Sequence, residues 1–142
     1  MLDLFAGSGA LALEALSRGA DRAVLVEKDA AHARHLGSVC SELGAAEARV
    51  LSSDTYAMLA AANRGEPFDI VFMDPPFADG RVAELCAALA AGNWLSNGAL
   101  VYIEQDINDE LPELPSGWVV RKQKTAGQVS YLLVSAENAG EL

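Results

Sequence analysis

The stretch Asp3-Leu4-Phe5-Ala6-Gly7-Ser8-Gly9 carries a short apolar strand, Met1–Phe5, directly into a glycine-rich turn. Apolar residues at helical spacing follow in Ser8–Arg18, and Gly19 is placed to end that helix. Glycines in such a turn let the backbone approach a ligand without a Cβ in the way. This order of strand, turn and helix predicts a ligand site at the carboxyl edge of an α/β sheet.

The alternation of strand and helix continues along the chain. We expect further strands at Ala23–Glu27, Ala48–Leu51, Phe68–Met73 and Ala99–Glu104, and helices over Asp29–Leu43, from Asp54 or Thr55 to about Asn63, and over Asp79–Ala91. Near-continuous apolar strands between helices predict a parallel sheet covered on both faces. The last two runs, Val119–Lys124 and Val129–Val134, predict a hairpin. The expected fold class is therefore α/β: a doubly wound, mainly parallel, seven-stranded-type sheet with a C-terminal antiparallel hairpin.

Length and composition favour one globular domain over residues 1–142, of which 51% are hydrophobic. No apolar run approaches the ~20 residues of a membrane-spanning helix, and no signal-peptide pattern opens the chain. Cys40 and Cys86 are expected to be buried free thiols, which suits a cytoplasmic protein. His32 and His35 have no third ligand nearby in the sequence, so we expect no metal.

The net charge of −10 is unusual for a protein that binds nucleic acid, which normally needs cations against phosphates. Arg121, Lys122 and Lys124 form a small basic patch that could touch phosphate. A solvated strand face would have the same sequence, so both interpretations stay open.

Three carboxylates suit a nucleoside ligand: Asp3 inside the glycine motif, Glu27 at the end of a predicted strand, and Asp54 after the next strand. Glu27 can accept hydrogen bonds from ribose hydroxyls, and Asp54 can accept one from an adenine amino group. A solvated strand end and a helix N-cap are the alternative roles of these two residues. Asp3 can reach an ammonium group, directly or through water. Because a sulfonium ligand with an ammonium group favours acidic neighbours and a pyrophosphate does not, the sequence favours S-adenosylmethionine over NAD.

The predicted S-adenosylmethionine site collects these carboxylates, the glycine turn and their direct neighbours. Its members are Asp3, Phe5, Gly7, Ser8, Gly9, Glu27, Lys28, Asp54 and Thr55. Residues 7–12 also fit the G-x-G-x-x-G/A dinucleotide fingerprint, so a NAD-dependent dehydrogenase stays an alternative.

The most specific motif is Asp74-Pro75-Pro76-Phe77, which closes the strand Phe68–Met73. It suits methyl transfer to a planar exocyclic amine, whose lone pair is delocalised into the ring. Acceptors on the N–H groups, Asp74 and the Pro75 carbonyl, favour a more pyramidal and more nucleophilic nitrogen. The two prolines, Pro75 and Pro76, restrict φ and hold these oxygens in place. Phe77 offers a ring for base stacking. An ordinary turn after a strand is the alternative.

The chain resembles the guanine(966)-N2 methyltransferases of 16S ribosomal RNA, a class I S-adenosylmethionine-dependent family. The resemblance rests on DLFAGSGALALEALSRGA, VLVEKD, FDIVFMDPPF and KTAGQVSYLL and covers nearly the whole chain. It implies a Rossmann-like methyltransferase domain, cofactor contacts around Asp3, Gly7, Gly9, Glu27 and Asp54, and catalysis at residues 74–77. It also implies transfer of a methyl group to the exocyclic N2 of a guanine.

The family carries an extension rich in Arg and Lys before the glycine motif, so we expect residues 1–142 to be one N-terminally truncated domain. Expected partners are ribosomal RNA, the small ribosomal subunit or an assembly intermediate, with no membrane and no metal, and the protein is expected to be a monomer. Adenine-N6 methylation of DNA, glutamine-N5 methylation of protein, and an inactive truncated cofactor-binding module stay open as alternatives.

Overall fold

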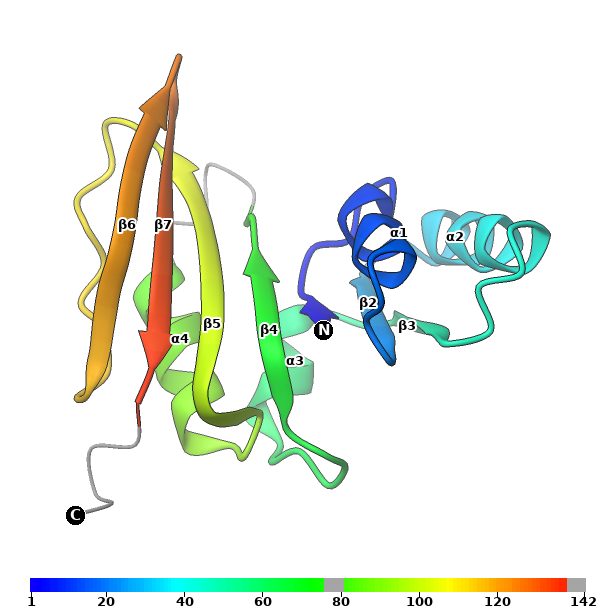
Figure 1. Cartoon of the computed structure of the whole chain (residues 1–142), viewed down its shortest axis with the longest axis horizontal. Helices are drawn as coiled ribbons and strands as arrows, with labels where there is room; N and C mark the ends of the chain where they lie inside the picture. Colours follow the sequence, from blue (N-terminus) through cyan, green and yellow to red (C-terminus); the bar gives the residue numbers. More distant parts are fainter. Residues whose placement is uncertain (76–80, 138–142) are drawn as a thin grey trace. The chain divides into compact units, whose positions relative to one another are not determined.

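The computed structural model describes residues 1–75 and 81–137 of the chain. These fall into two compact units, Met1–Met58 and Leu59–Leu142, called here the N-terminal and the C-terminal unit. Figure 1 traces both along the sequence.

The N-terminal unit is built on three parallel strands, β1 (Leu2–Asp3), β2 (Ala23–Glu27) and β3 (Ala48–Ser52), with β2 in the middle. The helices α1 (Ala10–Ser17) and α2 (Ala30–Glu42) connect them, and α3 (Thr55–Ala60) follows β3. Helix α2 is capped at its predicted start, where the Asp29 carboxylate accepts the His32 backbone N–H. Its buried Ala33, Leu36 and Cys40 recur at helical spacing, which turns one side of α2 toward the core.

The C-terminal unit holds four strands in the order β4-β5-β7-β6 and the helix α4 (Val82–Ala91). The strands are β4 (Phe68–Met73), β5 (Leu95–Asp106), β6 (Trp118–Ala126) and β7 (Val129–Ala136). Strand β4 runs parallel to β5, whereas β7 is antiparallel to both β5 and β6 (Figure 1).

The strands of the C-terminal unit bury one face only. Val101, Ile103, Leu132 and Val134 alternate along β5 and β7 and are almost completely buried. The residues between them on the two strands, which include Tyr102, Glu104, Tyr131 and Leu133, stay partly exposed. Because successive side chains of a strand point to opposite faces, these residues lie together on the other side. We call this second side the open face.

The predicted elements agree with the structure in type and order, and β2 and β4 agree to the residue. Strand β1 is shorter than predicted, β5 begins earlier, at Leu95, and α4 is described from Val82. Asp79, the expected start of α4, lies outside the described residues. The hairpin closes through only Gly127 and Gln128, because Ala126 already pairs with Val129. Gly127 has a φ of 59°, which glycine adopts without strain.

Both cysteines are free and buried, and burial raises the pKa of the Cys86 thiol to about 12. Within residues 1–75 and 81–137 there is no helix long and apolar enough to cross a membrane. The same residues contain no group of three or more His, Cys, Asp or Glu side chains that could hold a metal ion.

Two glycines allow a test of the helix packing. A Cβ on Gly37, inside α2, would meet nothing within 4 Å. We expect Gly37→Ala to raise the free energy of unfolding by about 0.5–1 kcal/mol, because alanine loses less backbone entropy in a helix. A Cβ on Gly92 would lie 2.6 Å from the Trp94 Nε1 atom and 3.2 Å from the Ala88 carbonyl oxygen. Gly92→Ala should therefore lower the free energy of unfolding by about 1–3 kcal/mol. Urea unfolding of both variants measures the two effects, and a loss of stability in Gly37→Ala would contradict the packing of α2.

Candidate functional site

Three predicted cofactor segments lie at one edge of the N-terminal unit. Strands β1, β2 and β3 are parallel, with Asp3 beside Leu25 and Glu27 beside Ser52 in the register. The glycine turn follows β1, Glu27 is the last residue of β2, and Asp54 comes shortly after β3. Parallel strands present their carboxyl ends at the same edge, where α/β sheets bind ligands.

The two glycines of the turn have different structural reasons. Both adopt positive φ, 55° at Gly7 and 79° at Gly9. A Cβ on Gly9 would come within 2.9 Å of the Leu36 side chain, so close packing against α2 requires glycine there. A Cβ on Gly7 would meet no atom within 4 Å, so Gly7 borders open space that a ligand can enter. Ser8 between them is exposed, and its Oγ accepts the Ala10 backbone N–H at 3.4 Å.

Glu27 is held in place by the residues that follow it. Its side chain is only 15% exposed, and its Oε1 accepts the Asp29 backbone N–H at 3.1 Å. A carboxylate has about four lone-pair sites, so this bond leaves capacity for ribose hydroxyls. The next residue, Lys28, directly follows β2 and is exposed. Glu27 is thus a positioned acceptor and not a freely rotating surface side chain.

Asp54 takes the N-cap role considered from the sequence. Its Oδ1 accepts the Tyr56 backbone N–H at 2.9 Å as α3 begins. Capping uses one oxygen, and the remaining lone pairs can still accept an adenine amino group. The buried Thr55 hydroxyl donates to the Leu4 backbone carbonyl, which ties the start of α3 to the residue directly after β1. This hydrogen bond of Thr55 therefore helps to position the neighbouring Asp54.

Asp3 and Phe5 complete the N-terminal part of the predicted site. Asp3 is buried, and its Oδ1 accepts the Phe5 backbone N–H at 3.3 Å. The Phe5 ring meets the Tyr56 ring edge-on, with ring centroids 6.4 Å apart. This edge therefore combines carboxylate acceptors, an open glycine backbone and an aromatic pair. These acceptors fit S-adenosylmethionine, which offers ribose hydroxyls, an adenine amine and an ammonium group as donors, and they suit a pyrophosphate poorly.

The start of the catalytic motif belongs to the C-terminal unit. Asp74 follows β4 directly, and Pro75 after it is buried. Pro76 and Phe77, the rest of the predicted catalytic motif, lie outside the described residues.

Asp74 shares a hydrogen bond with the Glu104 side chain, a residue that the sequence analysis did not select. Met73 of β4 pairs with Ile103 of β5, so the residues that follow them, Asp74 and Glu104, lie beside one another. Burial raises the pKa of Asp74, while the hydrogen bond from Glu104 acts in the opposite direction. The pKa of Glu104 is raised by burial, by repulsion from Asp74 and by the shared hydrogen bond. The shared hydrogen bond thus lowers the pKa of Asp74 and raises that of Glu104, as expected when Glu104 donates and Asp74 accepts.

Glu104 carried a signal that would have revealed it. It ends a predicted strand with a carboxylate, as Glu27 does. Two aromatic residues on the open face, Tyr102 and Tyr131, were also not selected. The Tyr102 and Tyr131 rings lie 6.0 Å apart between centroids. Burial and then the charge of Glu104 raise the pKa of Tyr102 to about 12, so its hydroxyl stays protonated at neutral pH.

Comparison with known proteins places this geometry in a family. The family model described as "Conserved hypothetical protein 95" matches residues 1–135. The "Ribosomal RNA small subunit methyltransferase D" of Escherichia coli strain K12 is 44% identical over 140 residues, which cover 99% of this chain and 70% of the relative. The chain belongs to this family. The resemblance inferred from the sequence motifs is thereby confirmed.

Solved structures of two bacterial proteins share the fold. Methyltransferase yhhF of Escherichia coli has a TM-score of 0.91 and 44% identity, covering 96% of this chain and 76% of its own. Methylase HI0767 of Haemophilus influenzae has a TM-score of 0.90 and 35% identity, covering 96% of this chain and 86% of its own. The predicted α/β fold class, with mainly parallel strands and a C-terminal antiparallel hairpin, is confirmed.

The Asp74–Glu104 pair predicts a particular dependence of stability on pH. The folded-state pKa of Glu104 lies above its ordinary 4.5, so the folded protein holds the proton more tightly than the unfolded chain. The free energy of unfolding should then fall as the pH rises from the ordinary carboxyl range through the folded-state pKa. In Glu104→Gln the amide can still donate to Asp74 but does not titrate. We expect this variant to lose less stability than the wild type between pH 4 and pH 8.

Thermal unfolding of both proteins across that range is the measurement. Asp106→Asn, at the half-buried end of the same strand, is the control for removal of one acidic group, because an amide oxygen can still accept the Asn108 backbone N–H that Asp106 Oδ1 accepts. Parallel curves for the wild type and Glu104→Gln would show that Glu104 does not keep its proton in the folded state.

Proposed function

We propose that the chain uses S-adenosylmethionine to methylate the exocyclic N2 amino group of a guanine in small-subunit ribosomal RNA. The observation that carries the proposal is the acceptor Asp74, held at the end of β4 by the buried Pro75, in a member of the methyltransferase D family. Relatives are named for the small-subunit ribosomal RNA, which supports RNA as the substrate class over DNA or a protein glutamine.

Residues of the N-terminal unit would hold the cofactor. Glu27 would accept the ribose hydroxyls, Asp54 the adenine amine, and Asp3 the ammonium group, while the backbone at Gly7 makes room for the ligand. The other predicted contacts are Phe5, Ser8, Gly9, Lys28 and Thr55. When bound, S-adenosylmethionine supplies a methyl group activated by a sulfonium, so the chain itself needs no metal and no covalent intermediate.

Residues of the C-terminal unit would activate the target nitrogen. Asp74 and the Pro75 carbonyl each accept an N–H of the amine, which draws electron density toward the nitrogen and favours pyramidal geometry. The hydrogen bond with Glu104 fixes the Asp74 carboxylate before the substrate arrives. Phe77 would stack on the base, and Pro76 would restrict the loop.

The proposal extends to the whole chain and its surroundings. We infer that residues 1–142 work as one methyltransferase domain and as a monomer. The substrate would be ribosomal RNA, free or in a small subunit or assembly intermediate. The place of action would be the cytoplasm, which suits two free thiols.

The role of Asp74 is tested by Asp74→Ala, assayed with undermethylated small ribosomal subunits and radiolabelled S-adenosylmethionine. We expect the wild type to label the RNA and the variant to lose at least about 10²-fold in kcat, because one acceptor at the reacting nitrogen is gone. Binding of S-adenosylhomocysteine, measured by calorimetry, should stay nearly unchanged, since Asp74 acts on the target amine.

Three results would argue against this role. Equal loss of cofactor affinity and turnover in Asp74→Ala would indicate that Asp74 binds the cofactor and not the target amine. Labelling of adenine or of protein by the wild type would support the other amino-group substrates. Cofactor binding without transfer to any RNA would support an inactive cofactor-binding module.

The cofactor is tested at Glu27. We expect Glu27→Ala to weaken S-adenosylhomocysteine about 10–100-fold, the loss of one or two hydrogen bonds to a charged acceptor. Glu42→Ala, at the exposed end of α2, removes the same charge outside the predicted site and should leave affinity unchanged. Calorimetry with S-adenosylhomocysteine and with NAD separates the two ligands. Tighter binding of NAD by the wild type would favour the dehydrogenase alternative.

A further inference from the structure

The open face of the C-terminal unit presents two rows of side chains across three or four strands. In one row Glu104 of β5 pairs with Tyr131 of β7, which pairs with Lys124 of β6. In the next row Phe72 of β4 pairs with Tyr102, followed by Leu133 and Lys122. Each row leads from the side of the sheet that carries Asp74 toward one lysine on the outermost strand, Lys124 in the first row and Lys122 in the second.

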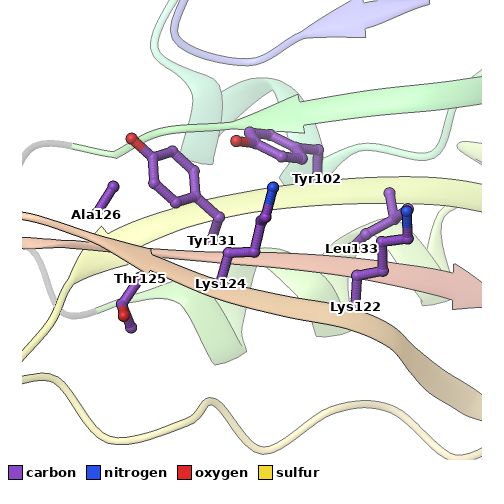
Figure 2. A pocket seen from close by; sticks show the side chains of 7 residues that line it. All are labelled: Tyr102, Lys122, Lys124, Thr125, Ala126, Tyr131 and Leu133. Carbon is purple, nitrogen blue, oxygen red and sulfur yellow. The ribbon is translucent and has the colours of Figure 1, made fainter.

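The middle of this face is aromatic and hollowed. The Phe72 and Tyr102 ring centroids are 5.7 Å apart, and the Tyr102 and Tyr131 centroids are 6.0 Å apart. A shallow hollow of about 620 Å³ lies against both tyrosines, both lysines and Leu133. Figure 2 shows these five side chains rising from the same side of the sheet. The hollow therefore offers ring faces with cations beside them.

A β-bulge places the lysines there. The register of β6 against β7 shifts between Val120 and Lys122, which leaves Arg121 as an extra residue. Without the shift, Lys122 and Lys124 would point to the opposite face, because a slip of one residue exchanges the two faces of a strand. Arg121 is already engaged: its Nε donates to the Ser135 Oγ at 2.8 Å, and its Nη2 lies 3.3 Å from the Glu137 carboxylate.

Lys122 and Lys124 differ from Arg121 because neither has an ion-pair partner within residues 1–75 and 81–137. Acidic residues outnumber Lys and Arg 20 to 10 in this chain, so most cations could find an acidic partner. Two lysines without such a partner beside one hollow are therefore unexpected. Ammonium groups complement phosphates, and tyrosine rings complement bases. Every nucleotide of a single-stranded nucleic acid carries both a phosphate and a base. An acidic peptide would pair with the lysines but would leave the tyrosine rings without a stacking partner.

We propose that the open face is an RNA-docking surface, on which Lys122 and Lys124 hold phosphates and Tyr102 and Tyr131 stack bases of the strand that flanks the methylated nucleotide. The inference deepens the proposed function, since it takes the substrate to be RNA. It adds where the RNA lies: from Glu104, beside Asp74, across β7 to β6.

The lysines are tested with Lys122→Gln/Lys124→Gln in the full chain. The probe is a fluorescent single-stranded RNA whose anisotropy is followed from 50 to 200 mM salt. Each lost phosphate contact should lower the salt-dependence slope by about 0.7 and the affinity about fivefold at 0.1 M salt, so the double variant should bind about 25-fold more weakly. Arg64→Gln/Arg34→Gln, two exposed cations elsewhere, is the matched control and should change affinity much less.

The rings are tested with Tyr131→Leu and Tyr131→Phe. Loss of stacking in the leucine variant should weaken RNA binding at least about fivefold with an unchanged salt slope, whereas phenylalanine keeps a ring and should restore binding. Thermal unfolding shows whether either variant is destabilised. Equal affinities of the leucine and phenylalanine variants would overturn the stacking role.

The outcomes separate this surface from the proposed reaction. If the lysine variant binds RNA as tightly as the wild type and still methylates small subunits, the docking surface is wrong and the proposed function stands. If the wild type binds RNA through this face but transfers no methyl group, the surface stands and the proposed function fails. A lysine variant that changes the oligomeric state, measured by light scattering, and leaves RNA affinity intact would assign the face to protein contacts and overturn the proposal.

Discussion

The pairing register of β4, β5 and β7 is the constraint on which the C-terminal unit depends. It sets Ile103 opposite Leu132 and Val101 opposite Val134, and these residues form the buried face. Because side chains alternate, the same register sends Tyr102, Glu104 and Tyr131 to the open face. The core and the chemistry of this unit are thus fixed together, and a slip of one residue would bury Glu104 and expose Ile103. Hydrophobic burial of about 1.5–3 kcal/mol for each large core side chain stabilises the register and, with it, the Asp74–Glu104 pair.

Several parts of the fold could be predicted from local sequence. Strands β2 and β4 are short apolar runs bounded by polar residues, so their ends are visible in the sequence itself. The start of β5 was not predicted, because Ser96, Asn97 and Gly98 interrupt its apolar pattern and the pairing with β4 is irregular there. The hairpin was recognised, but its turn is shorter than expected because Thr125 and Ala126 still pair with β7. These strand ends depend on pairing with a neighbouring strand, so the local sequence of one strand does not predict them.

The candidate site divides in the same way. Glycines and carboxylates after strands point to a ligand edge because the parallel topology brings strand ends together. The sequence does not show that Asp54 also caps α3 or that Glu27 also holds the Asp29 N–H. Nor does it show the hydrogen bond between Asp74 and Glu104, which are far apart in the chain. Glu27 and Asp54 are thus oriented by backbone N–H groups and Asp74 by a side chain, and such preorganisation lowers the entropic cost of binding.

The charge of this chain shows why composition alone is a weak guide to an RNA-binding surface. Salt screens exposed charges beyond about 8–10 Å, so a phosphate responds to its nearest cations more than to the net charge of −10. What matters locally is whether a cation is already neutralised, and the bulge in β6 separates the two cases. It turns Lys122 and Lys124 toward the tyrosines, while Arg121 engages Glu137. From the sequence these three residues form one basic patch. In the structure Arg121 is paired, whereas Lys122 and Lys124 have no ion-pair partner among residues 1–75 and 81–137 and lie against the same hollow as Tyr102 and Tyr131.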